Sequence, residues 1–313
     1  KERHLQLARR KLQTAKQKLT AFVDEQEDVI FRLKTKRRRL QAAAEQKLAK
    51  HLVETHKQAK PDLDVSVLAG MHRNKLPAYF EQTMDCDEIS RAFEGADKLL
   101  LISSPDIGRR APQHQAAIDA AQAAGVGLVA YTSILNAPAS PLMLAEEHRA
   151  TEAALAASGL PHILLRNGWY AENYVPAIAA APGLGAIFGA AGTGRIAAAA
   201  RADYAEAAAA ALIGGAAGDV HELAGAPGFD MAGLAAQVAE VSGKPVAYTD
   251  LPQAGYAAAL EANGLPGPLA AMLADSDAGA AKGGLDGPGA PLEALIGRPA
   301  TPMSVTIRAA LGV

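Results

Sequence analysis

The chain has one cysteine, few aromatic residues and no long apolar run. Each of these features limits the kind of protein that the chain can be. Cys86 is the only cysteine among 313 residues, which excludes an internal disulfide framework and predicts a reducing, cytoplasmic location. Aromatic residues make up 4%, so the core must consist mainly of aliphatic side chains. No apolar run reaches the roughly 18 residues of a membrane-spanning helix. The spacing of His and Cys also predicts no metal site.

Glycine is scarce in the first third of the chain, where only Gly70 and Gly95 precede residue 101. A Rossmann-type dinucleotide site normally needs a glycine-rich loop between a first strand and a first helix, because backbone N–H groups must approach a pyrophosphate. The later run Gly189-Ala-Ala-Gly192-Thr-Gly194 has a similar spacing, but it follows no buried strand and leads into no capped helix. We interpret it as a loop or hairpin.

Charge is divided unevenly along the chain. Residues 1–60 carry 17 Lys and Arg against 7 Asp and Glu, whereas the remainder carries 14 against 26. The first segment has no glycine or proline, and its composition predicts a basic amphipathic helical segment that ends before Pro61. The basic run 34–39 could neutralise phosphates, so nucleic-acid binding stays open, although most such runs form a solvated helix face. Self-association into a homo-oligomer is a further alternative for this segment.

From Ile89 onward, apolar runs that predict strands alternate with helical patterns. The predicted strands are Lys98–Ser103, Gly127–Ser133, His162–Leu165 and Val220–Leu223. The predicted helices are Gln113–Ala124, Leu144–Ser158, Asp203–Ile213, Met231–Ser242, Tyr256–Asn263 and Leu269–Ala274, with a Gly-rich loop over 182–194. This alternation predicts an α/β fold with a Rossmann-like parallel sheet over 61–175 and a small C-terminal, substrate-side region over 176–313.

Polar side chains follow three of these predicted strands. They are Ser103 and Ser104 after the first, Tyr131, Thr132 and Ser133 at the second, and Asn167, Gly168, Trp169 and Tyr170 after the third. Because the carboxyl ends of parallel strands share one crevice, we expect these residues to form one ligand-binding surface. Hydroxyl and amide groups can orient a sugar, a phosphate or a carboxamide there without adding charge. The alternative is that the hydroxyls cap helices and Trp169 fills the core.

His148 lies inside the helix that follows the second predicted strand. If that helix covers the crevice, His148 could donate a hydrogen bond or carry a proton. A lone histidine in a helix is more often a surface or buried structural residue. Both interpretations stay open.

Several runs match a known family in order and spacing. They are Lys98–Ser103, Arg110–His114, Ala130–Ser133, Arg166–Tyr174, Gly189–Gly192, Arg201–Ala205, Leu273–Asp277 and Lys282–Leu285. From about residue 89 onward, the chain resembles the NmrA-like atypical short-chain dehydrogenases, and most of all their bacterial NAD(P)H:quinone oxidoreductases. The resemblance implies a Rossmann-type sheet, a small C-terminal lobe, NADPH or NADH as cofactor, and a quinone that accepts hydride. The alternative is a non-enzymatic NmrA-type regulator or scaffold with a dinucleotide-binding fold that uses its basic helix to bind a partner or nucleic acid.

The resemblance also implies roles for individual residues. It implies that the residues bordering the nicotinamide and its ribose are Ser103, Ser104, Tyr131, Thr132 and Ser133. It also implies that the junction between nicotinamide and quinone is lined by Asn167, Gly168, Trp169 and Tyr170. Glu172 and Asn173 would shape the substrate pocket. His148 stands where short-chain dehydrogenases usually have an active-site Lys, so the expected catalytic residues are Asn167, Tyr170 and His148.

The resemblance does not extend to the start of the chain. Family members begin with a strand and a Gly-x-x-Gly-x-x-Gly loop, and residues 1–82 contain no such loop. Val65–Ala69 and Arg73 are candidates for the family's second strand and for the Arg that meets the 2′-phosphate. The basic helical segment stands where the loop is expected.

Overall fold

The computed structural model describes residue 89 and residues 92–313, which belong to one compact unit. The predicted basic helical segment, the run 34–39 and the strand candidate Val65–Ala69 with Arg73 lie outside these described residues. None of the helices in the described part has the length and apolarity of a membrane span.

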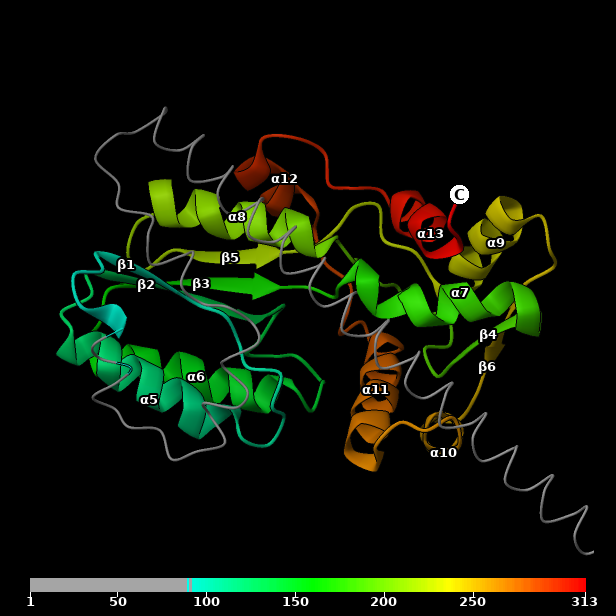
Figure 1. The fold of residues 1–313 in the computed structure, drawn as a ribbon, viewed down its shortest axis with the longest axis horizontal. Coiled ribbons are helices and arrows are strands. Elements are labelled where there is room, and N and C mark those ends of the chain that lie inside the picture. Colours follow the sequence, from blue (N-terminus) through cyan, green and yellow to red (C-terminus); the bar gives the residue numbers. More distant parts are fainter. Residues whose placement is uncertain (1–88, 90–91) are drawn as a thin grey trace, which may run out of the picture. The chain divides into compact units, whose positions relative to one another are not determined.

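A four-stranded parallel sheet forms the centre of the described fold (Figure 1). Its strands, in spatial order, are β1 (Lys98–Leu101), β2 (Leu128–Ile134), β3 (His162–Asn167) and β5 (Val220–Leu223). Every residue of β2 is buried, as expected for a parallel strand covered on both faces. All four predicted strands are confirmed, although β1 ends two residues earlier than predicted and β3 continues two residues further.

Helices cover both faces of this sheet (Figure 1). On one face lie α5 (Arg110–Ala123) and α6 (Ala145–Ser158), and on the other lie α8 (Arg201–Gly214) and α12 (Ala290–Ile296). Successive side chains of a strand point to opposite faces. Ala130 and Leu165 therefore pack in the core under α8, whereas Tyr131 contacts α6. The predicted α/β fold is confirmed.

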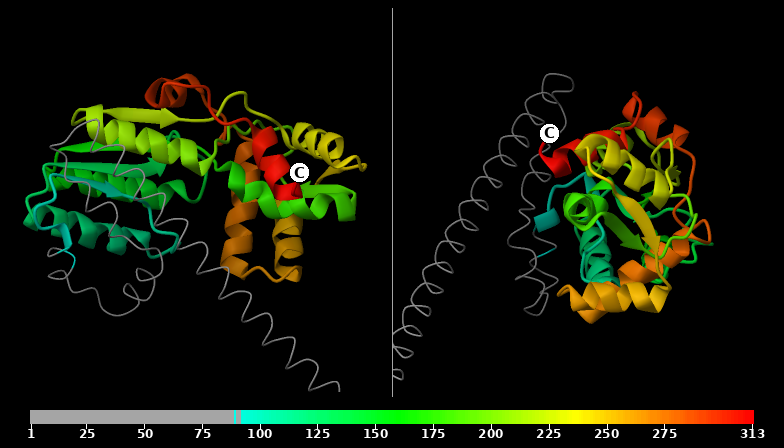
Figure 2. Two further views of the ribbon diagram at one scale, coloured as in Figure 1. Left: turned by 45° about the horizontal axis from the view of Figure 1, so that its top comes forward. Right: turned by 90° about the vertical axis from the view of Figure 1, so that its right-hand side faces the viewer.

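The residues after β3, apart from α8, β5 and α12, form a smaller C-terminal lobe (Figure 2). Its helices are η1 (Ala171–Tyr174), α7 (Val175–Leu184), α9 (Met231–Ser242), α10 (Gln253–Ala262), α11 (Gly267–Ala280) and α13 (Met303–Leu311). A two-stranded parallel sheet pairs β4 (Ala186–Gly189) with β6 (Ala247–Asp250). The chain returns to the main sheet as α12 before it ends in the lobe as α13, which packs against α7 and α9.

The predicted Gly-rich loop over 182–194 is partly wrong, because it contains the end of α7 and all of β4. Gly185 ends α7 in the left-handed region at φ 69°, a conformation that favours glycine. Gly189 ends β4, where a Cβ would come within 2.7 Å of the Asp277 carboxylate. Both glycines therefore serve regular structure, although their spacing is typical of a loop.

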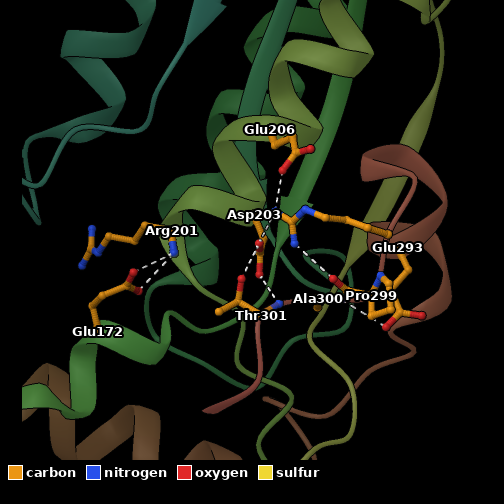
Figure 3. Close-up of polar contacts among 9 residues, drawn as sticks. Glu172, Arg201, Asp203, Glu206, Glu293, Pro299, Ala300 and Thr301 are labelled. Atoms are coloured by element: carbon orange, nitrogen blue, oxygen red, sulfur yellow. Dashed lines mark hydrogen bonds and ion pairs between the residues drawn. The ribbon is translucent and has the colours of Figure 1, made fainter. Parts of the chain in front are cut away.

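A buried carboxylate joins α8 to the segment that follows α12 (Figure 3). Asp203 is completely buried in the first turn of α8. It accepts hydrogen bonds from Arg298 Nη2 at 2.8 Å and from the backbone N and Oγ1 of Thr301 at 2.7 and 2.9 Å. Arg298 also donates to Glu206 on the surface of α8. The carboxylate thus holds the segment between α12 and α13 against α8.

Removal of this carboxylate is expected to cost far more stability than removal of its exposed neighbour. Asp203→Ala leaves Arg298 and the Thr301 groups without their buried acceptor, at a cost of about 3 kcal/mol in the free energy of unfolding. Glu206→Ala removes an exposed partner of the same guanidinium and costs less than about 1 kcal/mol. Urea denaturation of both variants measures the difference. Similar losses of unfolding free energy would contradict the role of Asp203 in holding the segment after α12.

Candidate active site

The carboxyl ends of β1, β2 and β3 meet, as predicted. The backbone N of Ser103 donates to Thr132 Oγ1 at 2.8 Å. Asn167 pairs in register with Ile134, and its carbonyl oxygen accepts the N–H of Leu135 at 2.9 Å. Residues from all three strand ends therefore lie along one edge of the sheet.

Asn167 and Gly168 form the most constrained part of this edge. Asn167 is 5% exposed, and its side-chain oxygen has no hydrogen-bond partner in the described part of the chain. A buried polar group left unpaired costs about 1–3 kcal/mol, so such an oxygen is expected to have a ligand or water as partner. A Cβ on Gly168 would lie 3.0–3.3 Å from the Tyr204 hydroxyl and from two carbonyl oxygens, so a side chain at position 168 would require these neighbours to shift.

This orphaned oxygen is the feature that fits a nicotinamide. The carboxamide of that ring has an NH2 group, and its ribose has hydroxyls, so either could donate to the Asn167 oxygen. An unpaired acceptor of this kind could bind the nicotinamide half of a dinucleotide. In the described part of the chain, the connection from β1 to α5 has Gly108 alone, whereas the connection from β5 to α9 contains Gly225 and Gly228.

Three residues that follow Gly168 contact Arg201, which was not among the site residues expected from the sequence. Figure 3 shows one of these contacts, between the Glu172 carboxylate and the backbone N of Arg201. The Arg201 guanidinium lies 4.3 Å from the centre of the Tyr170 ring, a cation–π distance. The Glu172 carboxylate accepts the backbone N–H of Arg201 at 3.0 Å, and Asn173 Oδ1 accepts from Arg201 Nη2 at 3.1 Å. The available signal was the family-matching run Arg201–Ala205.

Trp169 lies on the lobe side of the same turn. Its ring is half-buried and packs against the core of the C-terminal lobe, which includes Tyr174 and Phe229. Its carbonyl oxygen accepts from the backbone N of Ala199 at 3.1 Å and from the Tyr204 hydroxyl at 3.3 Å. Trp169 therefore lies where the main sheet meets the lobe, with part of its ring still accessible.

Tyr131 and His148 lie on the opposite face of the sheet, in a buried polar cluster under α5 and α6. The Tyr131 hydroxyl and His148 Nδ1 are 2.8 Å apart, and His148 Nε2 is 3.4 Å from Arg110 Nη1. Burial, together with the Arg110 guanidinium, lowers the pKa of His148 to about 3. Burial also raises the pKa of Tyr131. The structure brings His148 to Tyr131, and it does not bring His148 to Asn167 or Tyr170.

The same cluster holds Ser104 in place through His114. The backbone N of Ser104 donates to His114 Nε2 at 3.0 Å, and His114 Nδ1 lies 2.8 Å from Thr151 Oγ1. Burial and the charge of Arg110 lower the pKa of His114 to about 4. Both histidines are neutral near pH 7, and in this form they support the chain around β1 and β2.

The glycine run at the end of β4 cannot serve as a phosphate cradle in this structure. Its backbone N–H groups already donate to acidic and phenolic side chains: Ala190 to Asp277 at 2.9 Å, Ala191 to Tyr248 at 2.9 Å, and Gly192 to Asp250 at 2.8 Å. Carboxylates at these positions would repel a pyrophosphate. The run begins as the end of β4, so the expectation that it follows no buried strand was wrong, and the residues after Gly189 form a connecting loop.

No family model matches the chain, but individual relatives do. Quinone oxidoreductase 2 of Escherichia coli is 52% identical over 220 residues, which is 70% of this chain and 77% of the relative. The NADPH-dependent quinone oxidoreductase of Escherichia coli, solved with NADPH, superposes with a TM-score of 0.71 at 48% identity and covers 76% of this chain and 87% of that chain. Triphenylmethane reductase of Citrobacter sp., solved with NADP(H), has a TM-score of 0.70 at 30% identity, over 77% and 88% of the two chains.

These likenesses agree with the class that the fold and the polar sheet edge define, the atypical short-chain dehydrogenases. The chain belongs to the NmrA-like family of these proteins, in the group that contains quinone oxidoreductase 2. The predicted family is confirmed, and with it the Rossmann-like fold.

The buried histidines predict a pH dependence of stability that a single substitution can isolate. His148 has a pKa of about 3 when folded and 6.5 as its ordinary value, so the unfolded chain takes up a proton that the folded chain refuses. Its contribution to stability is complete above pH 6.5 and is lost as the pH falls below that value. Between pH 7 and pH 5.5 the loss is about 1 kcal/mol.

His148→Gln should therefore flatten the dependence of the free energy of unfolding on pH by this amount. His114, which acts in the same direction, and Asp277, whose pKa burial raises to about 6 with the opposite effect, are present in both proteins and cancel in the comparison. Urea denaturation at the two pH values gives the result. Parallel curves for wild type and variant would mean that the pKa of His148 is the same in the folded and the unfolded chain.

Proposed function

We propose that this chain reduces quinones with NADPH. The observation that carries the proposal is its 52% identity to quinone oxidoreductase 2 over 220 residues, a stretch long enough to include most of the described fold. The reaction consumes a quinone, a hydride and a proton and yields a hydroquinone. Bound NADPH would supply the hydride from its nicotinamide ring.

The chain's own contribution is to bind and orient the two reactants. The Asn167 oxygen would accept a hydrogen bond from the nicotinamide carboxamide or its ribose, and the Thr132 hydroxyl and Ser103 lie at the same edge. Trp169 and Tyr170 would provide the aromatic wall beside the quinone. Their rings exclude water from one side and favour a flat, apolar acceptor over a charged one.

His148 has a supporting role in this proposal, through Tyr131. It is neutral near pH 7, and both of its ring nitrogens face protein groups. Such a residue fixes the β2 strand end more readily than it delivers protons. Glu172 and Asn173 would act in a similar way by holding Arg201 over the Tyr170 ring. A single cysteine and the use of a reduced nucleotide fit the cytoplasm, which we propose as the location.

The proposal is tested with the full chain, NADPH and a series of benzoquinones and naphthoquinones. Quinone-dependent loss of the reduced-nicotinamide absorbance, together with micromolar NADPH affinity by calorimetry, is the expected result. NADH in place of NADPH measures the preference between the two cofactors. Absence of both NADPH binding and quinone turnover would overturn the proposed enzymatic function and favour a regulator that has the same fold.

Asn167→Ala is expected to separate binding from stability. The substitution removes an amide whose oxygen has no partner among the described residues, so the unfolding free energy should change by less than about 1 kcal/mol. The KM for NADPH should rise about tenfold, which corresponds to one lost hydrogen bond of about 1.4 kcal/mol. Steady-state kinetics and urea denaturation measure the two effects. An unchanged KM would exclude Asn167 from the cofactor site.

Trp169→Ala should impair turnover more than stability, because the ring is only half-buried at the edge of the lobe core. We expect kcat/KM for the quinone to fall at least about tenfold, while the unfolding free energy drops by about 1–2 kcal/mol. Phe229→Ala is the matched control, since Phe229 is buried in the same core and should cost about 3–5 kcal/mol. Equal stability losses in the two variants would make Trp169 an ordinary core residue.

A further inference from the structure

A row of polar side chains crosses the main sheet on the face opposite to the Asn167 side chain. Ser133 of β2, Arg166 of β3 and Glu222 of β5 are direct neighbours in register. All three stand one residue from the strand ends and point toward the layer of α5 and α6. Glu152 of α6 meets this row from above the sheet.

The Glu152 carboxylate accepts hydrogen bonds from both Arg166 and Ser133. Arg166 donates to it with two nitrogens, Nε to Oε1 at 3.0 Å and Nη2 to Oε2 at 2.8 Å, which is a bidentate arrangement. Ser133 Oγ donates to the same Oε1. The side chains of Arg166 and Glu152 are only 15% and 12% exposed. The pKa of Arg166 is raised, chiefly by its hydrogen bonds with Glu152 and then Glu222.

The network extends from α6 to the far strand and to a loop. Arg166 Nη1 donates to Glu222 Oε1 at 2.9 Å, and Glu222 Oε2 accepts the backbone N–H of Asn136 at 2.6 Å. The ends of β2, β3 and β5 and the start of the loop toward α6 are thereby connected through charged hydrogen bonds. Such bonds are about twice as strong as neutral ones, and the Arg fork also fixes their direction.

Arg166 immediately precedes Asn167, whose side-chain oxygen has no partner of its own in the described chain. The position of that amide therefore depends on the backbone on either side of it. On one side the guanidinium of Arg166 is held by two carboxylates, and on the other the Gly168 N–H donates to the Leu223 carbonyl at 2.7 Å. Leu223 follows Glu222 in β5, so both attachments lead to the same network.

We propose that Glu152 is a positioning residue for the cofactor and quinone site, acting through Arg166 on Asn167 and Trp169. The role in turnover rests on the proposed function, whereas the effect on the geometry of the strand end does not. Ser133, which the family resemblance places beside the cofactor, belongs to this network because its hydroxyl donates to Glu152.

The test compares Glu152→Gln with the wild-type full chain and with Glu206→Gln. An amide at position 152 keeps the shape of the carboxylate, but its NH2 group would face Arg166 as a second donor and break one arm of the fork. Glu206 is a suitable control because it also binds an arginine, Arg298, but lies on the exposed surface of α8. Trp169 is the chain's only tryptophan, so its fluorescence reports directly on the strand end.

In Glu152→Gln, the Trp169 emission of the cofactor-free protein should shift, and the KM for NADPH should rise at least about fivefold. Glu206→Gln should match the wild type in both measurements. Arg166→Lys, which keeps the charge but has no fork, should behave like Glu152→Gln. A lower melting temperature with unchanged emission and unchanged KM would overturn the proposal and leave Glu152 a structural residue.

Two further results are decisive in their own way. If Glu152→Gln does not fold, Ser133→Ala removes one contact from Glu152 and should change emission and KM in the same direction by about twofold, and no change would overturn the proposal. If the wild type neither binds NADPH nor reduces quinones, the proposed function fails. The emission of Trp169 then decides the positioning effect alone.

Discussion

Side-chain alternation in a parallel sheet covered on both faces is the constraint on which this site depends. Each step along a strand moves the next side chain into the other helix layer. Thr132 and Asn167 consequently face the side of α8 and the lobe, whereas Ser133 and Arg166 face α6. Four polar residues that look equivalent in the sequence therefore divide into a pair on the side of α8 and a pair that forms the network with Glu152.

Much of this arrangement could be predicted from the sequence, because the relevant signals are local. Apolar runs such as His162–Leu165 identify buried strands, and the polar residues after them mark the carboxyl edge. The partnership of Glu152 with Arg166 has no local signal, since it depends on how α6 lies across β3. For the same reason the sequence did not separate His148 from Asn167, which lie on opposite faces.

The lobe was harder to predict than the sheet, and the reason is the size of its elements. β4 and β6 have four residues each, and Gly189 at the end of β4 is part of a loop-like glycine run although it permits close approach to Asp277 and Tyr248. α13 (Met303–Leu311) was not among the helices predicted from the sequence. The domain limits at 61–175 and 176–313, and the role of residues 1–60, stay predictions.

The path of the chain after α11 has a consequence for how the molecule melts. The polypeptide leaves the lobe and packs α12 on the main sheet. Its Arg298 and Thr301 then bind Asp203 before the chain returns to the lobe as α13. Neither part can release its last helix without loosening the other, so the described fold should behave as one cooperative unit. Differential scanning calorimetry would then record a single endotherm for the sheet and the lobe together.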